Sequence, residues 1–317
     1  MVEPHGGEGV GSARGREPGA WLVVGAGRCG LQLARSMAAA GVPLSAVVDA
    51  DPGARARARR CLPGVAVLAP GERLPSAWGG LLAVPDSAIA ACAAGLAARV
   101  GRELRLAAHT SGVLPAAVLE PLRAPGRSLA ALHPLMAFGR GDGPLVPLAG
   151  VAAAVEGDPR GVRHVRALAR RLGLAPVSLP ARHKPLYHAL AALAANLAPA
   201  LVAAAARELA GLGPRPGWER RALAPLVLQA VRNVLETGDL SRLTGPLTRG
   251  DAATVRTHLE ALPDCLAEAY ASAARVAVEG LRRDGRITPE TASALDGALT
   301  NPVRCGSVLL VRLGEEG

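Results

Sequence analysis

From residue 20 to about residue 180, short apolar runs alternate with amphipathic stretches. The runs end in Gly, Pro, Asp or His, and they are AWLVVGAG, LSAVVDAD, GVAVLAP, GGLLAVPD, LRLAAHTSG and SLAALHPL. Stretches between them, such as 31–40 and 87–100, are long enough for helices. Continuous apolar runs are typical of strands buried on both faces, so the pattern predicts a parallel sheet with helices on either side. Two further strands, at 151–155 and 176–179, are expected to complete this domain.

The pattern changes after about residue 180, where Ala, Leu and Arg recur at helical period. The turn clusters GLGPRPG and TGPLTRGD separate three of the expected helices, and Thr288 with Pro289 forms a good start for the last one. The expected helices cover roughly 183–210, 219–237, 251–283 and 289–299.

These patterns predict an α/β Rossmann-type parallel-sheet domain followed by an all-α C-terminal domain. The expected parts are a disordered leader at 1–19, the sheet domain at 20–180, the helical domain at 181–300 and a tail at 301–317. The composition agrees, because 317 residues suffice for two domains and half of them are apolar. The 38 glycines have no three-residue period, which excludes collagen.

Cysteine usage and charge exclude several classes of protein. Five widely spaced cysteines without a CxxC pair do not fit a disulfide scaffold or a zinc site, so we expect no metal and a reducing cytoplasm. The net charge of +10 comes from scattered arginines, and the densest run, Arg55 to Arg60, fits the solvated face of a helix. Nucleic acid is therefore not an expected partner, since aromatic residues interleaved with the charge are also missing.

No membrane partner is expected either. The first nineteen residues lack the apolar core of a signal peptide. The segment 186–206 is long enough to span a membrane, but it is mostly Ala and contains His188, Asn196 and Pro199. We expect it to be a buried helix of the helical domain.

The first strand leads into a glycine-rich turn that is typical of dinucleotide binding. A strand, the motif GxGxxG, a helix and an acid about 20 residues further on form the Rossmann fingerprint, with the pyrophosphate at the helix N-terminus. Asp49 is that acid, and it favours NAD by accepting hydrogen bonds from the ribose. Arg55 or Arg57 could instead meet the 2′-phosphate of NADP, so the cofactor is NAD(P). The expected cofactor-binding turn is Gly25, Ala26, Gly27, Arg28, Cys29 and Gly30.

Three later strands end in residues that suit a ligand site at the same edge of the sheet, where the carboxyl ends of parallel strands meet. Val84 and Pro85 are expected to contact the cofactor. Asp86 follows them and could simply cap a helix that starts at Ser87. The substrate-binding candidates are His109, Ser111 and Gly112, and His133 is a catalytic candidate. Either histidine could instead be a loop residue bonded to backbone.

The stretch RHKPLYHALAALAAN opens the helical domain and places Lys184, Tyr187 and His188 on one helical face. Burial there would lower the pKa of Lys184 and suit it to proton transfer, with the other two as its catalytic neighbours. Lys184 is the only lysine among the 36 basic residues, and Arg cannot release a proton near neutral pH. A solvated first turn is the alternative.

The polar segment TGPLTRGDAATVRTHL carries two substrate-binding candidates. Arg249 could bind a carboxylate or phosphate with its planar guanidinium group. Asp251 is the other, although its position also fits the N-cap of the helix that starts at Ala252. An ordinary surface loop would explain the same pattern.

The motifs GAGRCG, VPDSAI, HTSG, HPLMAF, the run from Lys184 to Asn196, and LTGPLTRGDAATVRTHL together resemble the family of Rossmann-like and DUF2520 domain-containing proteins. The resemblance implies an NAD(P)-dependent oxidoreductase similar to the 6-phosphogluconate and β-hydroxyacid dehydrogenase superfamily, which includes ketopantoate reductase. It places Lys184 where hydroxyacid dehydrogenases have their acid/base lysine, with His188 in the place where Asn is usual. His133-Pro134-Leu135 is similar to the HPM sequence of prephenate dehydrogenases. The resemblance adds Asn196 and Thr244 to the substrate-binding candidates.

The sequence therefore predicts a cytoplasmic oxidoreductase that transfers a hydride to or from a small anionic carbonyl or hydroxy compound. The alternative is a non-catalytic dinucleotide-binding sensor or regulator, which would need the glycine-rich turn but no proton donor. Fold analogy and the apolar faces of the Ala/Leu-rich helices predict a homodimer.

Overall fold

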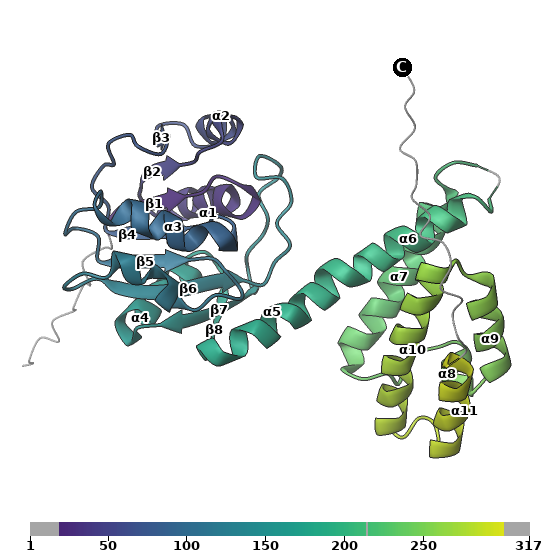
Figure 1. Ribbon diagram of the computed structural model, residues 1–317. Coiled ribbons are helices and arrows are strands. Elements are labelled where there is room, and N and C mark those ends of the chain that lie inside the picture. Colours follow the sequence, from purple (N-terminus) through teal and green to yellow (C-terminus); the bar gives the residue numbers. More distant parts are fainter. Residues whose placement is uncertain (1–18, 214, 301–317) are drawn as a thin grey trace, which may run out of the picture. The chain divides into compact units, whose positions relative to one another are not determined.

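The computed structural model describes residues 19–213 and 215–300, which form two compact units (Figure 1). The first unit extends to Ala195 and the second begins at Asn196. The helix that follows the last strand thus belongs with the sheet, and the boundary lies later than the expected residue 180. Apart from Gly19, the predicted leader at 1–19 and the tail at 301–317 lie outside the described residues.

The first unit contains an eight-stranded sheet in the order β3-β2-β1-β4-β5-β6-β7-β8. The strands from β3 to β6 are parallel, as predicted, whereas β7 is antiparallel to β6 and β8 is parallel to β7. The strands are β1 (Trp21–Val24), β2 (Leu44–Val48), β3 (Ala66–Leu68), β4 (Gly79–Leu82), β5 (Leu106–His109), β6 (Ser128–Pro134), β7 (Ala152–Gly157) and β8 (Ala175–Ser178).

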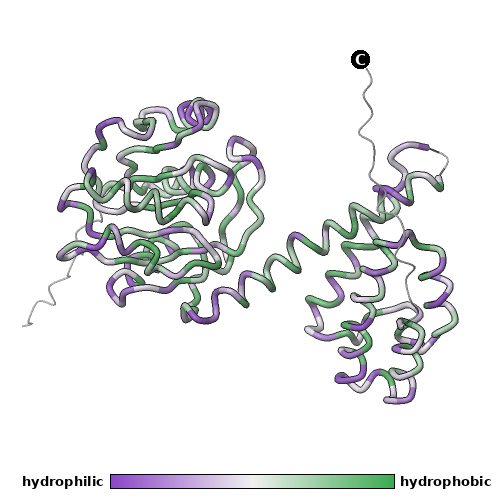
Figure 2. The backbone as a smooth tube through the Cα atoms, in the orientation of Figure 1, coloured by the Kyte–Doolittle hydropathy of each residue, from purple (hydrophilic) through white to green (hydrophobic). Residues whose placement is uncertain are grey.

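Helices cover both faces of the sheet. Neighbouring residues of a strand point to opposite faces, so each strand contributes to two cores. Trp21 and Val23 of β1 pack in one core with α1, α2 and α4, while Leu22 and Val24 pack in the other with α3 and η1. Figure 2 shows the apolar colouring of these strands. The helices are α1 (Arg28–Ala39), α2 (Pro52–Cys61), α3 (Asp86–Ala97), η1 (Ala116–Leu122), α4 (Pro159–Arg171), η2 (Ala181–His183) and α5 (Lys184–Ala192).

The antiparallel direction of β7 differs from the expected fully parallel sheet. A parallel neighbour needs a crossover connection, usually a helix, and residues 135–151 between β6 and β7 contain none. This segment is instead tied to α1. The amide of Gln32 donates to the carbonyl oxygens of Arg140 and Pro144, at 3.1 and 3.0 Å, and Arg35 donates to Gly141 and Gly143.

The second unit is helical, as predicted. Its core joins α9, α10 and α11 through Val255, Ala274, Val278 and Leu295. The expected helix 251–283 is two helices, because Pro263 cannot continue a helix and forms the N-cap of the second one. Its elements are α6 (Ala198–Ala210), α7 (Trp218–Thr237), α8 (Pro246–Arg249), α9 (Ala252–Ala261), α10 (Asp264–Arg283) and α11 (Pro289–Leu299), with the π-helical turn η3 (Leu193–Leu197) preceding α6.

One helical stretch, Ala181–Ala210, is long and apolar enough to cross a membrane by length and composition. None of its most apolar 18-residue window is buried in the chain, so the predicted burial of 186–206 is wrong. Four leucines of this stretch are spaced by four, seven and four residues, which places them on one helical face, and all are more than two-fifths exposed. They are Leu186, Leu190, Leu197 and Leu201. The apolar face that the sequence assigned to a core is open to solvent in the isolated chain.

Candidate active site

The turn between β1 and α1 has the geometry that a pyrophosphate needs. Gly25 has a φ of +99°, and a Cβ on it would lie 2.4 Å from the carbonyl oxygen of Ala83. A Cβ on Gly30 would lie 2.0 Å from the carbonyl oxygen of Gly25. A Cβ on Gly27, in contrast, would meet no atom within 4 Å. The outer glycines let the strand and helix pack, while Gly27 leaves open space at the N-terminus of α1, where backbone amides favour an anion.

Two carboxylates lie where β2 ends. Asp49 Oδ2 accepts a hydrogen bond from the amide of Ala26 at 2.6 Å, and Oδ1 accepts from the amide of Asp51 at 2.7 Å. Asp51 caps α2 and pairs with Arg57 at 3.5 Å. Arg55 donates to the carbonyl oxygens of Asp49, at 2.9 Å, and Ala50. The acid is thus joined to the glycine-rich turn, and both arginines already have partners.

The segment after β4 lies beside this turn. The side chain of Val84 is 3.1 Å from the Cβ position of Gly25, and Pro85 is exposed. Pro85 is the N-cap of α3, which begins at Asp86. The proposed cap by Asp86 is therefore wrong, because this residue is already helical and makes no side-chain cap hydrogen bond. Cys29 is half-buried on α1, and burial raises the pKa of its thiol to about 12.

His109 holds its own loop together. Its side chain is fully buried, its Nδ1 accepts from the amide of Ser111 at 3.0 Å, and its Nε2 lies 3.1 Å from the carbonyl oxygen of Pro115. An accepting Nδ1 places the proton on Nε2, which then donates to Pro115. Burial lowers the pKa of His109 to about 4, so the ring is neutral at neutral pH. Neither ring nitrogen is free for a substrate, which corrects the expected substrate contact and favours the loop alternative.

Ser111 is also used by the loop. It is 4% exposed, and its Oγ accepts from the amides of Val113 and Leu114 at 3.2 and 3.0 Å. These bonds leave only its hydroxyl hydrogen for another acceptor.

Lys184 is buried beneath the same loop, with 2% exposure. Its Nζ donates to the carbonyl oxygen of Ser111 at 3.1 Å and lies 3.6 Å from Glu156 Oε1. Burial lowers the pKa of Lys184, and the carboxylates of Glu156 and Asp86 oppose this effect. The predicted burial of the amine is confirmed over the solvated alternative. Glu156 was missed, although an acid within the apolar strand AAAVEG was a usable signal.

His133 and its neighbours on α5 form a polar cluster at the end of β6. His133 Nδ1 lies 3.0 Å from the hydroxyl oxygen of Tyr187, and the two rings meet edge to face. Burial lowers the pKa of His133 to about 4 and raises the pKa of Tyr187. The phenol therefore stays protonated and shares a hydrogen bond with Nδ1 of the neutral imidazole. The ring centroid of His188 lies 5.6 Å from that of His133.

Gly112, the last residue of the HTSG loop, packs against these two imidazoles. A Cβ on it would lie 2.4 Å from His188 Nδ1 and 2.8 Å from His133 Nε2. His188 Nδ1 is buried and has no hydrogen-bond partner among the described residues. One ring nitrogen of each histidine thus lies against Gly112, so a larger residue does not fit at this position.

The remaining candidates lie in the second unit. Asn196, Thr244 and Arg249 are exposed. Asp251 caps α9, since its carboxylate accepts from the amide and the hydroxyl of Thr254 at 3.0 and 2.6 Å. The structural role of Asp251 is therefore shown, while the substrate contacts of all four residues stay predictions.

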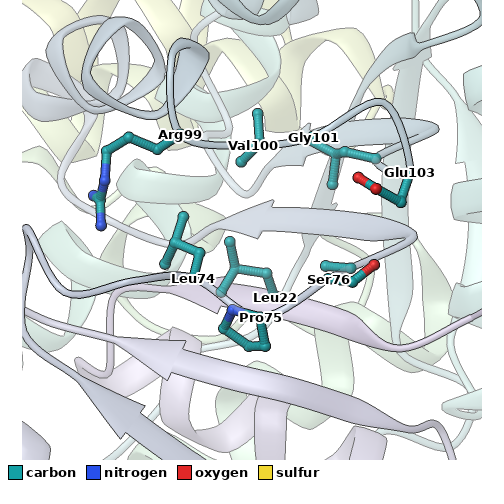
Figure 3. A pocket seen from close by; sticks show the side chains of 10 residues that line it. Leu22, Leu74, Pro75, Ser76, Arg99, Val100, Gly101 and Glu103 are labelled. Carbon is teal, nitrogen blue, oxygen red and sulfur yellow. The ribbon is translucent and has the colours of Figure 1, made fainter.

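A hollow at the opposite edge of the sheet does not suit the cofactor (Figure 3). It is lined by Leu22 of β1 and by residues 74–77, 99–101 and 103–104, which precede β4 and β5. This is the edge where parallel strands begin, whereas nucleotides bind where they end. Its volume of about 160 Å³ is also small for a ligand pocket. Within 19–213 and 215–300, no three His, Cys, Asp or Glu side chains gather as metal ligands.

The sheet order, the glycine-rich turn and the acid after β2 define a Rossmann-like fold. Residues 9–134 match the family model of the Rossmann-like domain, and residues 151–277 match that of the domain of unknown function DUF2520. The chain thus contains both the Rossmann-like domain and the DUF2520 domain, as its motifs predicted.

Solved structures show the same fold. A candidate NADP oxidoreductase from Bacteroides fragilis is 22% identical with a TM-score of 0.71, over 82% of this chain and 98% of that one. A protein from Thermotoga maritima is 21% identical with a TM-score of 0.64, over 84% and 100%. A pyrroline-5-carboxylate reductase from Coxiella burnetii is 15% identical with a TM-score of 0.51, over 90% and 100%. No curated protein sequence matches the chain.

Proposed function

We propose that the protein is a soluble, cytoplasmic NAD(P)-dependent oxidoreductase that transfers a hydride to or from a small anionic carbonyl or hydroxy compound. One observation carries the proposal. The open turn at Gly27 follows β1 and His133 lies at the end of β6, so both belong to the edge where the parallel strands end. Cofactor and substrate groups can therefore meet there without any change in the sheet.

The residues of the turn fit a nicotinamide dinucleotide. The backbone of Gly25–Gly30 and the N-terminus of α1 would hold the pyrophosphate, since a cradle without a Cβ at Gly27 is already present. Asp49 would accept from the ribose hydroxyls, and Val84 and Pro85 would lie beside the nicotinamide ring. The bound cofactor supplies the hydride, and the protein orients it and manages one proton.

NAD is favoured over NADP by the charge at the end of β2. A 2′-phosphate would face the carboxylates of both Asp49 and Asp51, and like charges repel. Arg55 and Arg57 would have to leave their present partners to neutralise it. The two carboxylates therefore support the preference that the sequence suggested.

The proton is proposed to belong to Lys184, with Tyr187 and His188 tuning its surroundings. The desolvated amine of Lys184 has a lowered pKa, which brings its neutral form closer to neutral pH, as an acid/base group requires. His133 would form a hydrogen bond with the substrate oxygen.

A metabolite screen with purified protein and NADH or NADPH, followed by absorbance, tests the proposal. Oxidation or reduction of the nicotinamide with a small carbonyl or hydroxy acid is the expected result. Dinucleotide binding without turnover of any compound would favour the sensor or regulator instead.

A further inference from the structure

Glu156 is a largely buried acid that nothing in the proposed function has used so far. It lies on β7 opposite Ala131 of β6, and its side chain is 12% exposed. Its Oε1 is 3.6 Å from Nζ of Lys184 and also accepts the amide hydrogen of Ala116 at the start of η1. A single carboxylate oxygen thus joins the strand to the helix α5 and to the segment that follows the HTSG loop.

The amine of Lys184 needs this partner because burying a charge is costly unless it is paired and hydrogen-bonded. Its other partner is the carbonyl oxygen of Ser111, which is neutral. The carboxylate of Glu156 is therefore the group in contact with Nζ that offsets its loss of hydration. It also fixes Nζ in space, since Glu156 is held by the backbone of a sheet strand and by the amide of Ala116.

We propose that Glu156 is a positioning residue that holds Nζ of Lys184 against the carbonyl oxygen of Ser111 and keeps it ready for proton exchange. The catalytic use of the amine rests on the proposed function, whereas the pairing is a property of the chain alone. The carboxylate itself does not touch substrate or cofactor.

The charged groups around Nζ come from four elements. Glu156 of β7 and Asp86 of α3 are acids that favour the ammonium form. His109 of β5 and His133 of β6 face it as well, but both have a pKa near 4 and are neutral above that pH. Tyr187 and His188 lie on α5 itself. Without Glu156, Asp86 would be the main group that counteracts the effect of burial on the amine. The pKa of Lys184 would therefore fall further.

This effect can be measured without a substrate, because Lys184 is the only lysine of the chain. Protein made with ¹³C-lysine and a lysine-free tag gives one side-chain resonance, whose pH titration reports the pKa of Lys184 directly. The wild type is expected to titrate below the usual lysine value of about 10.4. Glu156→Gln is expected to titrate lower than the wild type by about one pH unit or more.

Two further variants make the titration specific. Glu156→Asp keeps the carboxylate on a side chain that is one methylene group shorter. In this variant the pKa of Lys184 is expected to lie between the values in the wild type and in Glu156→Gln. Glu279→Gln removes an exposed acid that pairs with Arg282 at 2.8 Å, and it should leave the resonance of Lys184 unchanged. An unchanged titration in Glu156→Gln would overturn the proposal.

The wild-type protein provides an independent test if Glu156→Gln fails to fold. A paired and buried ammonium group exchanges its hydrogens slowly, so its ¹⁵N signal is expected to be visible near neutral pH. A resonance with the pKa and rapid exchange of a solvated lysine would contradict the pairing. Failure of the proposed function would look different, because a missing response to NADH leaves both measurements intact.

Discussion

Two histidines of the same sheet edge have different tasks. The sequence placed His109 and His133 at neighbouring strand ends, and the structure confirms that placement. It could not distinguish their roles, because both ring nitrogens of His109 are satisfied by the turn at 110–115, whose path is not encoded in a hydrophobic pattern. His133 instead shares a hydrogen bond with Tyr187, more than fifty residues further along the chain. Such long-range partners are beyond the reach of local spacing.

Acid is expected to destabilise the first unit through these histidines. The folded-state pKa of each is lowered from 6.5 to about 4, so the unfolded chain binds more protons between these values. The free energy of unfolding therefore falls as the pH drops from 6.5 toward 4, by roughly 1–3 kcal/mol for each ring. Urea unfolding at pH 7 and pH 5 measures this fall in the free energy of unfolding. In His109→Gln the loss between the two pH values should shrink, and a loss equal to that of the wild type would contradict the assignment.

Lys184→Arg and Lys184→Ala distinguish proton transfer from a mere positive charge. Arg keeps the charge but cannot release a proton near neutral pH. Once a substrate is known, kcat is expected to fall on the order of 10²-fold or more in both variants, while NADH still binds. Near-normal kcat in Lys184→Arg would move the proton to His133 or His188.

At the scale of elements, the strand–turn–helix unit was the best predicted part. Its signals are local, since β1, the glycines and Asp49 all lie within thirty residues, and every one of them has its expected place. The direction of β7 was not predicted, because it depends on the path of 135–151 over α1 rather than on the strand itself. The helix break at Pro263 was, in contrast, readable from the sequence and was missed.

Gly25 and Gly27 should respond differently to alanine. In Gly25→Ala, the new Cβ would lie 2.4 Å from a backbone oxygen at a φ of +99°, so we expect a loss of stability of at least ~1–3 kcal/mol. In Gly27→Ala, the Cβ meets no protein atom within 4 Å, so stability should change by less than about 1 kcal/mol. Its NADH affinity should fall by about tenfold or more, because the methyl group occupies the approach of the pyrophosphate. Thermal unfolding and calorimetry measure the two effects, and normal NADH binding by Gly27→Ala would contradict the assigned cradle.

At the scale of the whole molecule, large apolar side chains are exposed on the helices of the second unit. Leu201 of α6 and Leu226, Leu228 and Leu235 of α7 are between 43% and 78% exposed. Apolar hollows lie on two sides of α6, between α6 and α7 and between α6 and α10. The sequence predicted a homodimer from the apolar faces of these helices, although it also expected the segment 186–206 to be buried within the helical domain. We propose that a second copy of the chain covers this surface.

The wild type is therefore expected to be a dimer in sedimentation at micromolar concentration. Leu201→Arg combined with Leu228→Arg should give a monomer, because each places a charge on the surface to be covered. Leu145→Arg changes a leucine that is 40% exposed in the loop before β7 and should leave the dimer intact. A monomeric wild type, or binding of the protein to lipid vesicles, would contradict this proposal.

The central claim is that the turn from Gly25 to Gly30 binds a nicotinamide dinucleotide next to a substrate site. Titration calorimetry of the full chain with NADH and NADPH tests it most directly. The account predicts that NADH binds and that it binds more tightly than NADPH, because Asp49 and Asp51 repel a 2′-phosphate. Tighter binding of NADPH would shift the 2′ contact to Arg55 or Arg57. Absence of binding by both dinucleotides would contradict the account.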